Sequence, residues 1–253
     1  MTTQTPAAAR TGRVRARLSP RRRRLVGRVV QYVVLLAAFV AVALLIKWDS
    51  VAENIFNIDA ARALLPKIPR AFGNTLLYMV CSFALSIVLG TLLALMRVSE
   101  VRLYRIVSTI YVEFFRGIPA LLYVIAVGLA LPLVVNFSLT STLLKVTIAL
   151  GMVSSAYVAE TMRAGIQAVP RGQIEAARSL GMSKARTTLT VVVPQAFRIV
   201  LPPLTNEVIL LTKDTALISS LGLMIPEFEL TKIGQNALSS GAGGGLTPMF
   251  VVG

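Results

Sequence analysis

The chain has 253 residues, of which 55% are hydrophobic and 15% charged, and its formal net charge is +15. A single water-soluble core of this length has little use for so large an apolar fraction, so a bilayer is the expected environment. Histidine is absent and Cys81 is the one cysteine, which excludes an intrachain disulfide and argues against a metalloenzyme or a histidine-dependent hydrolase. The positive residues form blocks between apolar runs, a pattern that reports membrane topology rather than nucleic-acid binding.

The first 28 residues are rich in arginine and are predicted to form a disordered, basic tail in the cytoplasm, near anionic lipid headgroups. Residues 29–46 are nearly uncharged and are about as long as a helix needs to cross roughly 30 Å of hydrocarbon. Lys47, Trp48 and Asp49 then form an interfacial anchor, so a retained span is favoured over a cleaved signal peptide.

Four further apolar runs give five predicted spans in all; they cover 72–96, 118–135, 143–162 and 191–211. The run 216–225 is too short to cross and is expected to be a re-entrant or broken helix. Glycines 241 and 243–245 predict a flexible link, and 246–252 begins another apolar helix. The sequence stops at Gly253, so the rest of this sixth span is expected to be either truncated or missing.

The distribution of lysine and arginine predicts the orientation. With the tail inside and each run crossing once, the inner segments (the tail, 97–105 and 163–198) hold 18 of the 26 basic residues. This bias favours a cytoplasmic N-terminus in a multi-pass protein of the cell inner membrane. It also places the segment between the fourth and fifth spans in the cytoplasm.

That cytoplasmic segment has the local signals of two short helices joined at a corner. Pro170 suits the start of the first helix, Gly181 suits the left-handed residue that closes it, and Ser183 can cap the second. Ile174, Ala177 and Leu180 give the first helix one apolar face. A stiff corner of this kind can transmit force from a motor subunit, and an amphipathic helix lying on anionic lipid is the alternative reading of the same pattern.

A family resemblance rests on four segments. The run Glu175-Ala176-Ala177, followed by Gly181 and Pro194, resembles the EAA loop of binding-protein-dependent ABC importer permeases. The chain is similar to the polar amino-acid branch of that family in GNTLLYMVCSFALSIVLGTLLALMRVS (73–99), YVEFFRGIPALL (111–122), AYVAETMRAGIQAVPRGQIEAARSLG (156–181) and PQAFRIVLPPLTNEVILLTKDTALIS (194–219).

The resemblance implies an all-α fold, the type I importer permease, with five or six transmembrane helices over residues 29–253 and a coupling loop at about 169–194. It implies that the coupling helix docks on the ATPase through Glu175, Ala176, Ala177 and Gly181. The implied partners are an ABC ATPase dimer, a second permease that is identical or related, an extracytoplasmic binding protein and an amino acid such as glutamate, glutamine, arginine, histidine or cystine. The chain has no GxxxxGK[ST] phosphate loop, so ATP and magnesium are expected on the partner ATPase and the chain itself is not expected to be an enzyme.

Ionisable residues within the apolar runs need partners, because charge at membrane depth costs a few kcal/mol on insertion scales. Glu160 and Arg163, like Glu113 and Arg116, lie three residues apart and are predicted to form neutralising pairs within one helix. Gly117 and Pro119 break the helix directly after Arg116, so 103–116 can be an interfacial helix instead of part of the span.

Asn206, Glu207, Lys213 and Asp214 are the candidates for the substrate pathway. Glu207 or Asp214 could hold the ammonium group of an amino acid, and Asn206 or Lys213 its carboxylate. Hydrogen bonding between helices is the competing interpretation of these polar groups. For the whole chain, a channel or a secondary transporter is the alternative function, and the absence of a visible internal repeat argues against it.

Overall fold

The computed structural model describes residues 20–130, 141–239 and 245–252, which form helices and connecting turns. Residues 1–19 of the predicted tail lie outside the described residues, and so does the predicted glycine link except for Gly245. The chain divides into two compact units, 1–52 and 53–253.

The first unit contains helix α1 (Pro20–Leu45) and most of α2 (Trp48–Ile55). Helix α1 includes residues 20–28, which corrects the boundary predicted for the disordered tail. Arginine, leucine and valine do not oppose a helix, and Pro20 stands at its start, where a missing N–H costs nothing. None of the apolar stretch Leu25–Leu45 is buried, and Trp48 donates from Nε1 to the carbonyl of Ala43 at 2.9 Å.

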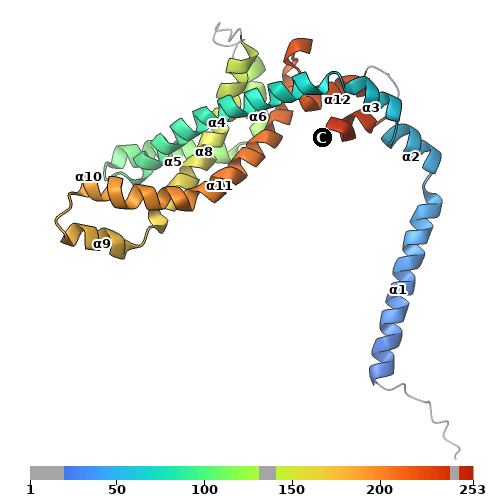
Figure 1. Ribbon diagram of the computed structural model, residues 1–253, viewed down its shortest axis with the longest axis horizontal. Coiled ribbons are helices and arrows are strands. Elements are labelled where there is room, and N and C mark those ends of the chain that lie inside the picture. The colour runs from blue at the N-terminus through green and yellow to red at the C-terminus, as the bar shows by residue number, and fades with distance from the viewer. Residues whose placement is uncertain (1–19, 131–140, 240–244, 253) are drawn as a thin grey trace, which may run out of the picture. The chain divides into compact units, whose positions relative to one another are not determined.

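The second unit is a helical bundle built around three long helices, α4 (Ile68–Val98), α8 (Thr142–Ala168) and α11 (Val193–Asp214) (Figure 1). Helix α8 is central: it packs along α4 and also contacts α5, α6 and α11. In α8, 56% of the most apolar stretch is buried, whereas in α4 the buried share is 28%. The two helices approach closely at Gly90, where an added Cβ would come within 2.7 Å of the Val158 side chain.

The segment between α4 and α8 bends instead of forming one straight span. Helix α5 (Arg102–Gly117) is followed by α6 (Ala120–Ile125) and the π-turn Ala126–Ala130, and the two parts meet at 102°. Gly117 and Pro119 stand at the break, because proline cannot continue the hydrogen-bond ladder and restricts the residue before it. The break thus falls where Gly117 and Pro119 predict it, with α5 as a separate helix before the predicted span at 118–135. The part of that span beyond 130 lies outside the described residues.

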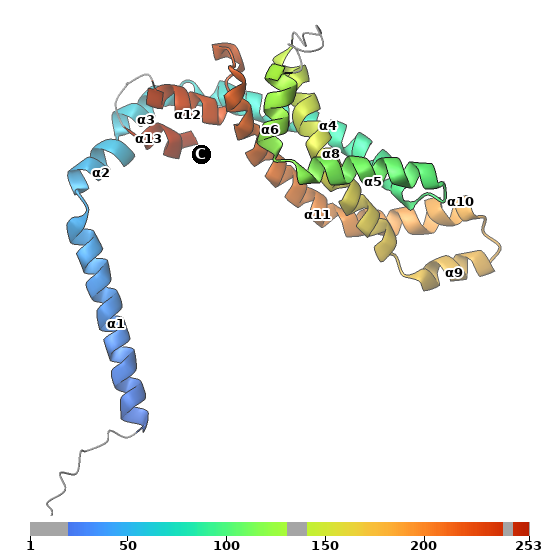
Figure 2. The same cartoon turned by 180° about the vertical axis from the view of Figure 1, so that it is seen from behind.

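Short elements occupy both ends of the bundle (Figures 1 and 2). At one end lie α9 (Arg171–Ser179), α10 (Lys184–Thr187) and the π-turn Thr188–Val192. At the other end lie α3 (Ile58–Leu64), the 3-10 turns η3 (Thr215–Leu221) and η4 (Ile225–Glu227), α12 (Leu230–Ser239) and α13 (Thr247–Val252). The run 216–225 is thus a broken, non-spanning segment, as its length predicts.

By length and composition the described residues contain four helices able to cross a membrane, or five spans if the bent pair α5 and α6 counts as one. This agrees with the predicted number of spans and with an all-α membrane fold. The buried core follows the helix contacts, with its largest cluster around Tyr78, Val146, Leu150, Leu211 and Ile218.

Candidate functional site

The corner between α9 and α10 is fixed by local hydrogen bonds. Helix α9 begins directly after Pro170 and ends in a Schellman motif, in which the N–H of Met182 donates to the carbonyl of Ala177 at 3.2 Å. Gly181 has φ +79°, the left-handed conformation that this motif requires and that a Cβ disfavours. Ser183 then caps α10 by accepting from the N–H of Arg186 at 3.3 Å.

The four predicted coupling residues lie on this corner. Ala177 is 5% exposed, and its neighbour Ile174 packs on the cluster of Val169, Val192 and Ala196. Glu175, Ala176 and Gly181 are exposed. Leu180 was predicted to share the apolar face, and this is wrong: it is 84% exposed, because it caps the helix where the chain turns away from the bundle.

An ion pair joins the corner to the neighbouring turn. Lys184, the first residue of α10, donates from Nζ to Glu100, which lies between α4 and α5. This hydrogen bond holds the pKa of Glu100 below its ordinary value. Both side chains are exposed, so the ion pair adds little to the stability of the fold.

A network of ion pairs links α4, α5 and α8 beside the corner. Arg97 of α4 donates from Nη1 to Glu160 Oε2 of α8 at 2.7 Å, and Arg163 donates from Nε to the same oxygen at 3.2 Å. The predicted pair of Glu160 with Arg163 is present. The predicted pair of Glu113 with Arg116 is wrong. Glu113 of α5 pairs instead with Arg97 of α4, at 3.4 Å.

Arg116 instead faces α8. Its guanidinium carbon lies 5.6 Å from the centroid of the Tyr157 ring, a cation–π contact. Arg116 also interacts electrostatically with Glu207 of α11. The residue therefore stands beside the polar pocket described next, a position that the spacing within its own helix did not predict.

A cavity of about 260 Å³ lies between α6, α8 and α11, and we call it the polar pocket. Glu207 and Asp214 line it from α11, where seven residues, about two turns, place them on one face. Ser154 and Tyr157 line it from α8, and Ala120 from α6. The hydroxyl of Ser154 is buried and has no hydrogen-bond partner among the described residues, so the pocket offers a free polar group.

The structure brings together two of the four predicted pathway residues. Glu207 and Asp214 are half-buried and line the polar pocket, whereas Asn206 and Lys213 are exposed and do not line it. Ser154 and Tyr157 were not predicted, since a serine and a tyrosine in an apolar run give no signal until the facing helix is known. The charged groups that line the pocket are both acidic, so it suits a cationic group.

These features define a class: a polytopic α-helical membrane protein with a stiff two-helix corner at one end of its bundle and an acidic pocket between its central helices. The comparison with family models gives the family. Residues 86–252 match the model of the binding-protein-dependent transport system inner membrane component, and the chain belongs to that family. It is accordingly a multi-pass protein of the inner membrane.

Similar proteins are amino-acid permeases. The chain is 35% identical over 192 residues to the inner membrane amino-acid ABC transporter permease protein YhdY of Escherichia coli strain K12, covering 74% of this chain and 51% of YhdY. It is 40% identical over 148 residues to the probable glutamine ABC transporter permease protein GlnM of Bacillus subtilis strain 168, covering 58% of this chain and 67% of GlnM. The chain thus spans about half the length of YhdY and two thirds of GlnM.

A solved structure shares the fold. The crystal structure of an amino acid ABC transporter with histidines superposes with a TM-score of 0.65 at 33% identity, covering 72% of this chain and 82% of that chain. This likeness confirms the predicted importer-permease fold.

Proposed function

We propose that this chain is the permease subunit of an ATP-driven importer of polar amino acids. The observation that carries the proposal is the family match over residues 86–252, supported by relatives that are named amino-acid permeases. In this role the chain forms the membrane pathway. A partner ATPase binds ATP with magnesium and hydrolyses the nucleotide. An extracytoplasmic binding protein delivers the amino acid.

The corner is the element proposed to receive force from the ATPase. Glu175, Ala176, Ala177 and Gly181 are its proposed docking residues, and the exposed Leu180 adds an apolar contact that the sequence did not predict. A rigid corner transmits displacement instead of absorbing it. The capped turn at Gly181 and Ser183 and the anchor of Ile174 supply that rigidity.

The polar pocket is proposed to lie on the substrate pathway. Glu207 and Asp214 would hold an ammonium group, and the free hydroxyl of Ser154 would accept or donate one further hydrogen bond. The other two candidates, Asn206 and Lys213, are exposed and do not line this pocket. They would contact the substrate only outside the polar pocket. Two acidic groups favour amino acids that carry a second positive charge.

The proposed orientation has the corner and the N-terminus in the cytoplasm, with α12 at the extracytoplasmic end. Basic residues support it, since 18 of 26 lie in segments assigned to the inner side. The second permease, identical or related, is proposed to pair with this chain in the bilayer. The Arg-rich tail is proposed to meet lipid headgroups and not nucleic acid.

Reconstitution tests the proposal. The chain is incorporated into nanodiscs with its partner ATPase, and ATP hydrolysis is measured while candidate binding proteins loaded with single amino acids are added. We expect one loaded binding protein to stimulate hydrolysis and, in liposomes, ATP-dependent uptake of its amino acid. Uptake at the full rate without any ATPase would identify a channel or a secondary transporter instead.

A further inference from the structure

A second pocket lies at the end of the bundle away from the corner. It has a volume of about 300 Å³ and is lined by Lys67, Arg70 and Ala71 at the start of α4 and by Ile225, Phe228 and Asn236 of the facing segment, among others. We call it the outer pocket. Since α4 has 31 residues and is about 46 Å long, the outer pocket is separated from the corner by the thickness of a membrane.

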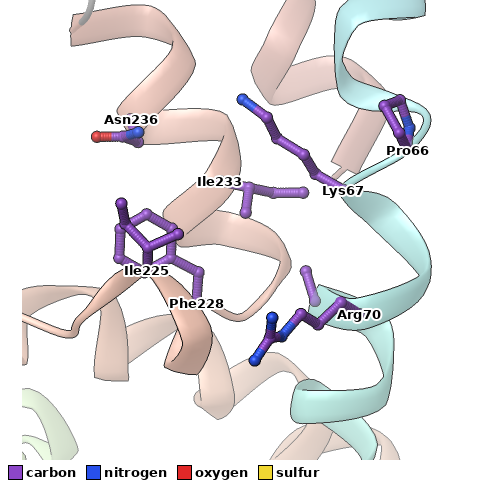
Figure 3. A pocket seen from close by; sticks show the side chains of 8 residues that line it. Pro66, Lys67, Arg70, Ile225, Phe228, Ile233 and Asn236 are labelled. Carbon is purple, nitrogen blue, oxygen red and sulfur yellow. The ribbon is translucent and has the colours of Figure 1, made fainter.

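The outer pocket is basic on one side and apolar on the other. Figure 3 shows Lys67 and Arg70 extending from α4, with Ile225, Phe228 and Asn236 on the other side. The two basic residues lie three positions apart, which places them on one face of the chain as it enters α4. Both are exposed, and neither forms an ion pair with any residue in 20–130, 141–239 or 245–252.

The facing wall is the segment 225–236, and neither of its acidic residues forms an ion pair with Lys67 or Arg70 in the part of the chain that the structure describes. Glu227 accepts from the N–H of Met224 at 3.2 Å. Glu229, only 1% exposed, accepts from the N–H groups of Thr231 at 2.6 Å and Lys232 at 2.7 Å. Each carboxylate thus caps a nearby turn or helix and is directed to backbone N–H groups instead of to the two cations.

Helix α4 holds the facing wall in place. The side-chain amide of Asn74 donates to the carbonyls of Pro226 at 3.0 Å and Phe228 at 2.9 Å, and the Tyr78 hydroxyl donates to the carbonyl of Glu227 at 3.0 Å. A wall fixed in this way loses little conformational freedom when a ligand binds, which favours affinity.

The rim, by which we mean Ile225 of the outer pocket and the preceding Met224, is apolar and exposed. Met224 is 73% and Ile225 is 77% exposed, in a segment whose backbone is broken by Gly222 at φ +67°. Irregular backbone is not stable against hydrocarbon, so this rim faces water or protein and not the lipid tails. Exposed apolar side chains beside unpaired cations are typical of a protein-binding surface.

The wall is also connected to α11. Lys232 donates from Nζ to the carbonyl of Ser219 at 2.8 Å, and Gln235 donates from Nε2 to the Ser219 hydroxyl at 3.2 Å. Ser219 lies in η3, which follows α11 directly after Asp214 of the polar pocket. A partner seated on the wall therefore has a short, hydrogen-bonded route to the proposed pathway.

We propose that the outer pocket receives an acidic side chain of the extracytoplasmic binding protein, whose surrounding apolar surface covers Met224 and Ile225. The inference rests on the proposed function, because it takes the binding protein as the partner. A carboxylate that enters the outer pocket meets two cationic side chains, Lys67 and Arg70, and complements their charge. With a volume of about 300 Å³, the pocket has room for such a side chain.

The test uses the reconstituted complex of permease, ATPase and the loaded binding protein that stimulates it. The double variant Lys67→Glu and Arg70→Glu should raise the binding-protein concentration for half-maximal ATPase activity at least about tenfold, as like charges now meet. The maximal rate and the basal rate should not change. The neutral pair Lys67→Met and Arg70→Met should give a smaller increase and a weaker dependence on salt.

Arg62→Glu is the matched control, since Arg62 is exposed on α3 and does not line the outer pocket. It should change the half-maximal concentration by less than about twofold. Replacing one acidic residue of the binding protein with lysine should restore its interaction with the double variant, and the residue that does so is the docked carboxylate.

Three outcomes would overturn the proposal. The first is a half-maximal concentration that stays the same in the double variant. The second is an effect that follows the anionic lipid content of the nanodisc and not the binding protein, which would make this a headgroup site. The third is competition by free glutamate, which would make it a small-anion site. If no binding protein stimulates the wild-type complex, the proposed function itself fails, and the inference fails with it.

Discussion

Arg97 of α4 and Glu160 of α8 are joined by a hydrogen bond of 2.7 Å near the corner end of the bundle. Both side chains are mostly covered, with 19% and 27% exposed. Glu160 also accepts from Arg163, so one carboxylate serves two guanidinium groups from two helices. Because α9 continues the chain just beyond α8, this junction supports the base from which the corner projects.

Replacing Glu160 with glutamine should reduce stability. The change removes the charge on which two partly covered arginines depend, and we expect a loss of about 1–2 kcal/mol after allowing for solvent screening. Thermal unfolding of the detergent-purified chain measures it. Glu113→Gln is the control: that side chain is 64% exposed and 3.4 Å from Arg97, so it should cost less than about 0.5 kcal/mol. Equal losses for the two variants would contradict a special role for Glu160.

Replacing Gly181 with valine should uncouple transport. A β-branched residue at φ +79° is strained by about 1–2 kcal/mol or more, and the Schellman turn that sets the corner angle would shift. We expect insertion and basal ATPase activity to persist, while stimulated ATPase activity and uptake fall at least about tenfold. Gly172→Ala is the matched control, because an added Cβ there meets nothing within 4 Å and φ is not positive. Wild-type uptake by the valine variant would count against the corner.

The corner could be predicted from the sequence because its signals are local. Pro170, Gly181 and Ser183 each act on the backbone within a few residues, and the structure places all three as predicted. The membrane spans were predictable for a similar reason, since their length and hydropathy are properties of one segment. The exposed position of Leu180 was not, because it depends on where the helix leaves the bundle.

Contacts between helices could not be predicted in this way. Glu113 has Arg116 within reach on its own helix but pairs with Arg97, which is sixteen residues earlier in the chain. Ser154 gave no signal at all, yet its free hydroxyl lies in the polar pocket that Glu207 and Asp214 also line. Both cases depend on the packing of α8 against its neighbours, which a single sequence does not specify.

Removing the acidic charge of the polar pocket should weaken transport of the substrate. Glu207→Gln or Asp214→Asn should raise the substrate concentration for half-maximal uptake by about tenfold, since a charge-assisted contact with the ammonium group is lost. Liposome uptake assays measure the change. Lys213→Met serves as the control, because Lys213 is exposed beside Asp214 but does not line the pocket. A larger effect for Lys213 than for Asp214 would place the pathway on the other face of α11.

Glu229 should make stability depend on pH. Burial raises its pKa above the ordinary value of 4.5, against the opposing effect of the N–H groups of Thr231 and Lys232 and the charge of Lys232. The folded chain therefore holds this proton more tightly than the unfolded chain. Its contribution to stability is largest below pH 4.5 and decreases as the pH rises through the raised pKa.

Two variants separate the charge of Glu229 from its capping role. Glu229→Gln should remove this pH dependence from thermal unfolding curves recorded between about pH 4 and pH 8, while the amide oxygen still accepts from the start of α12. Glu229→Ala removes the acceptor and should cost about 1–2 kcal/mol at every pH, because the N–H groups of Thr231 and Lys232 lose their partner. If the glutamine variant keeps the wild-type pH profile, another group controls it.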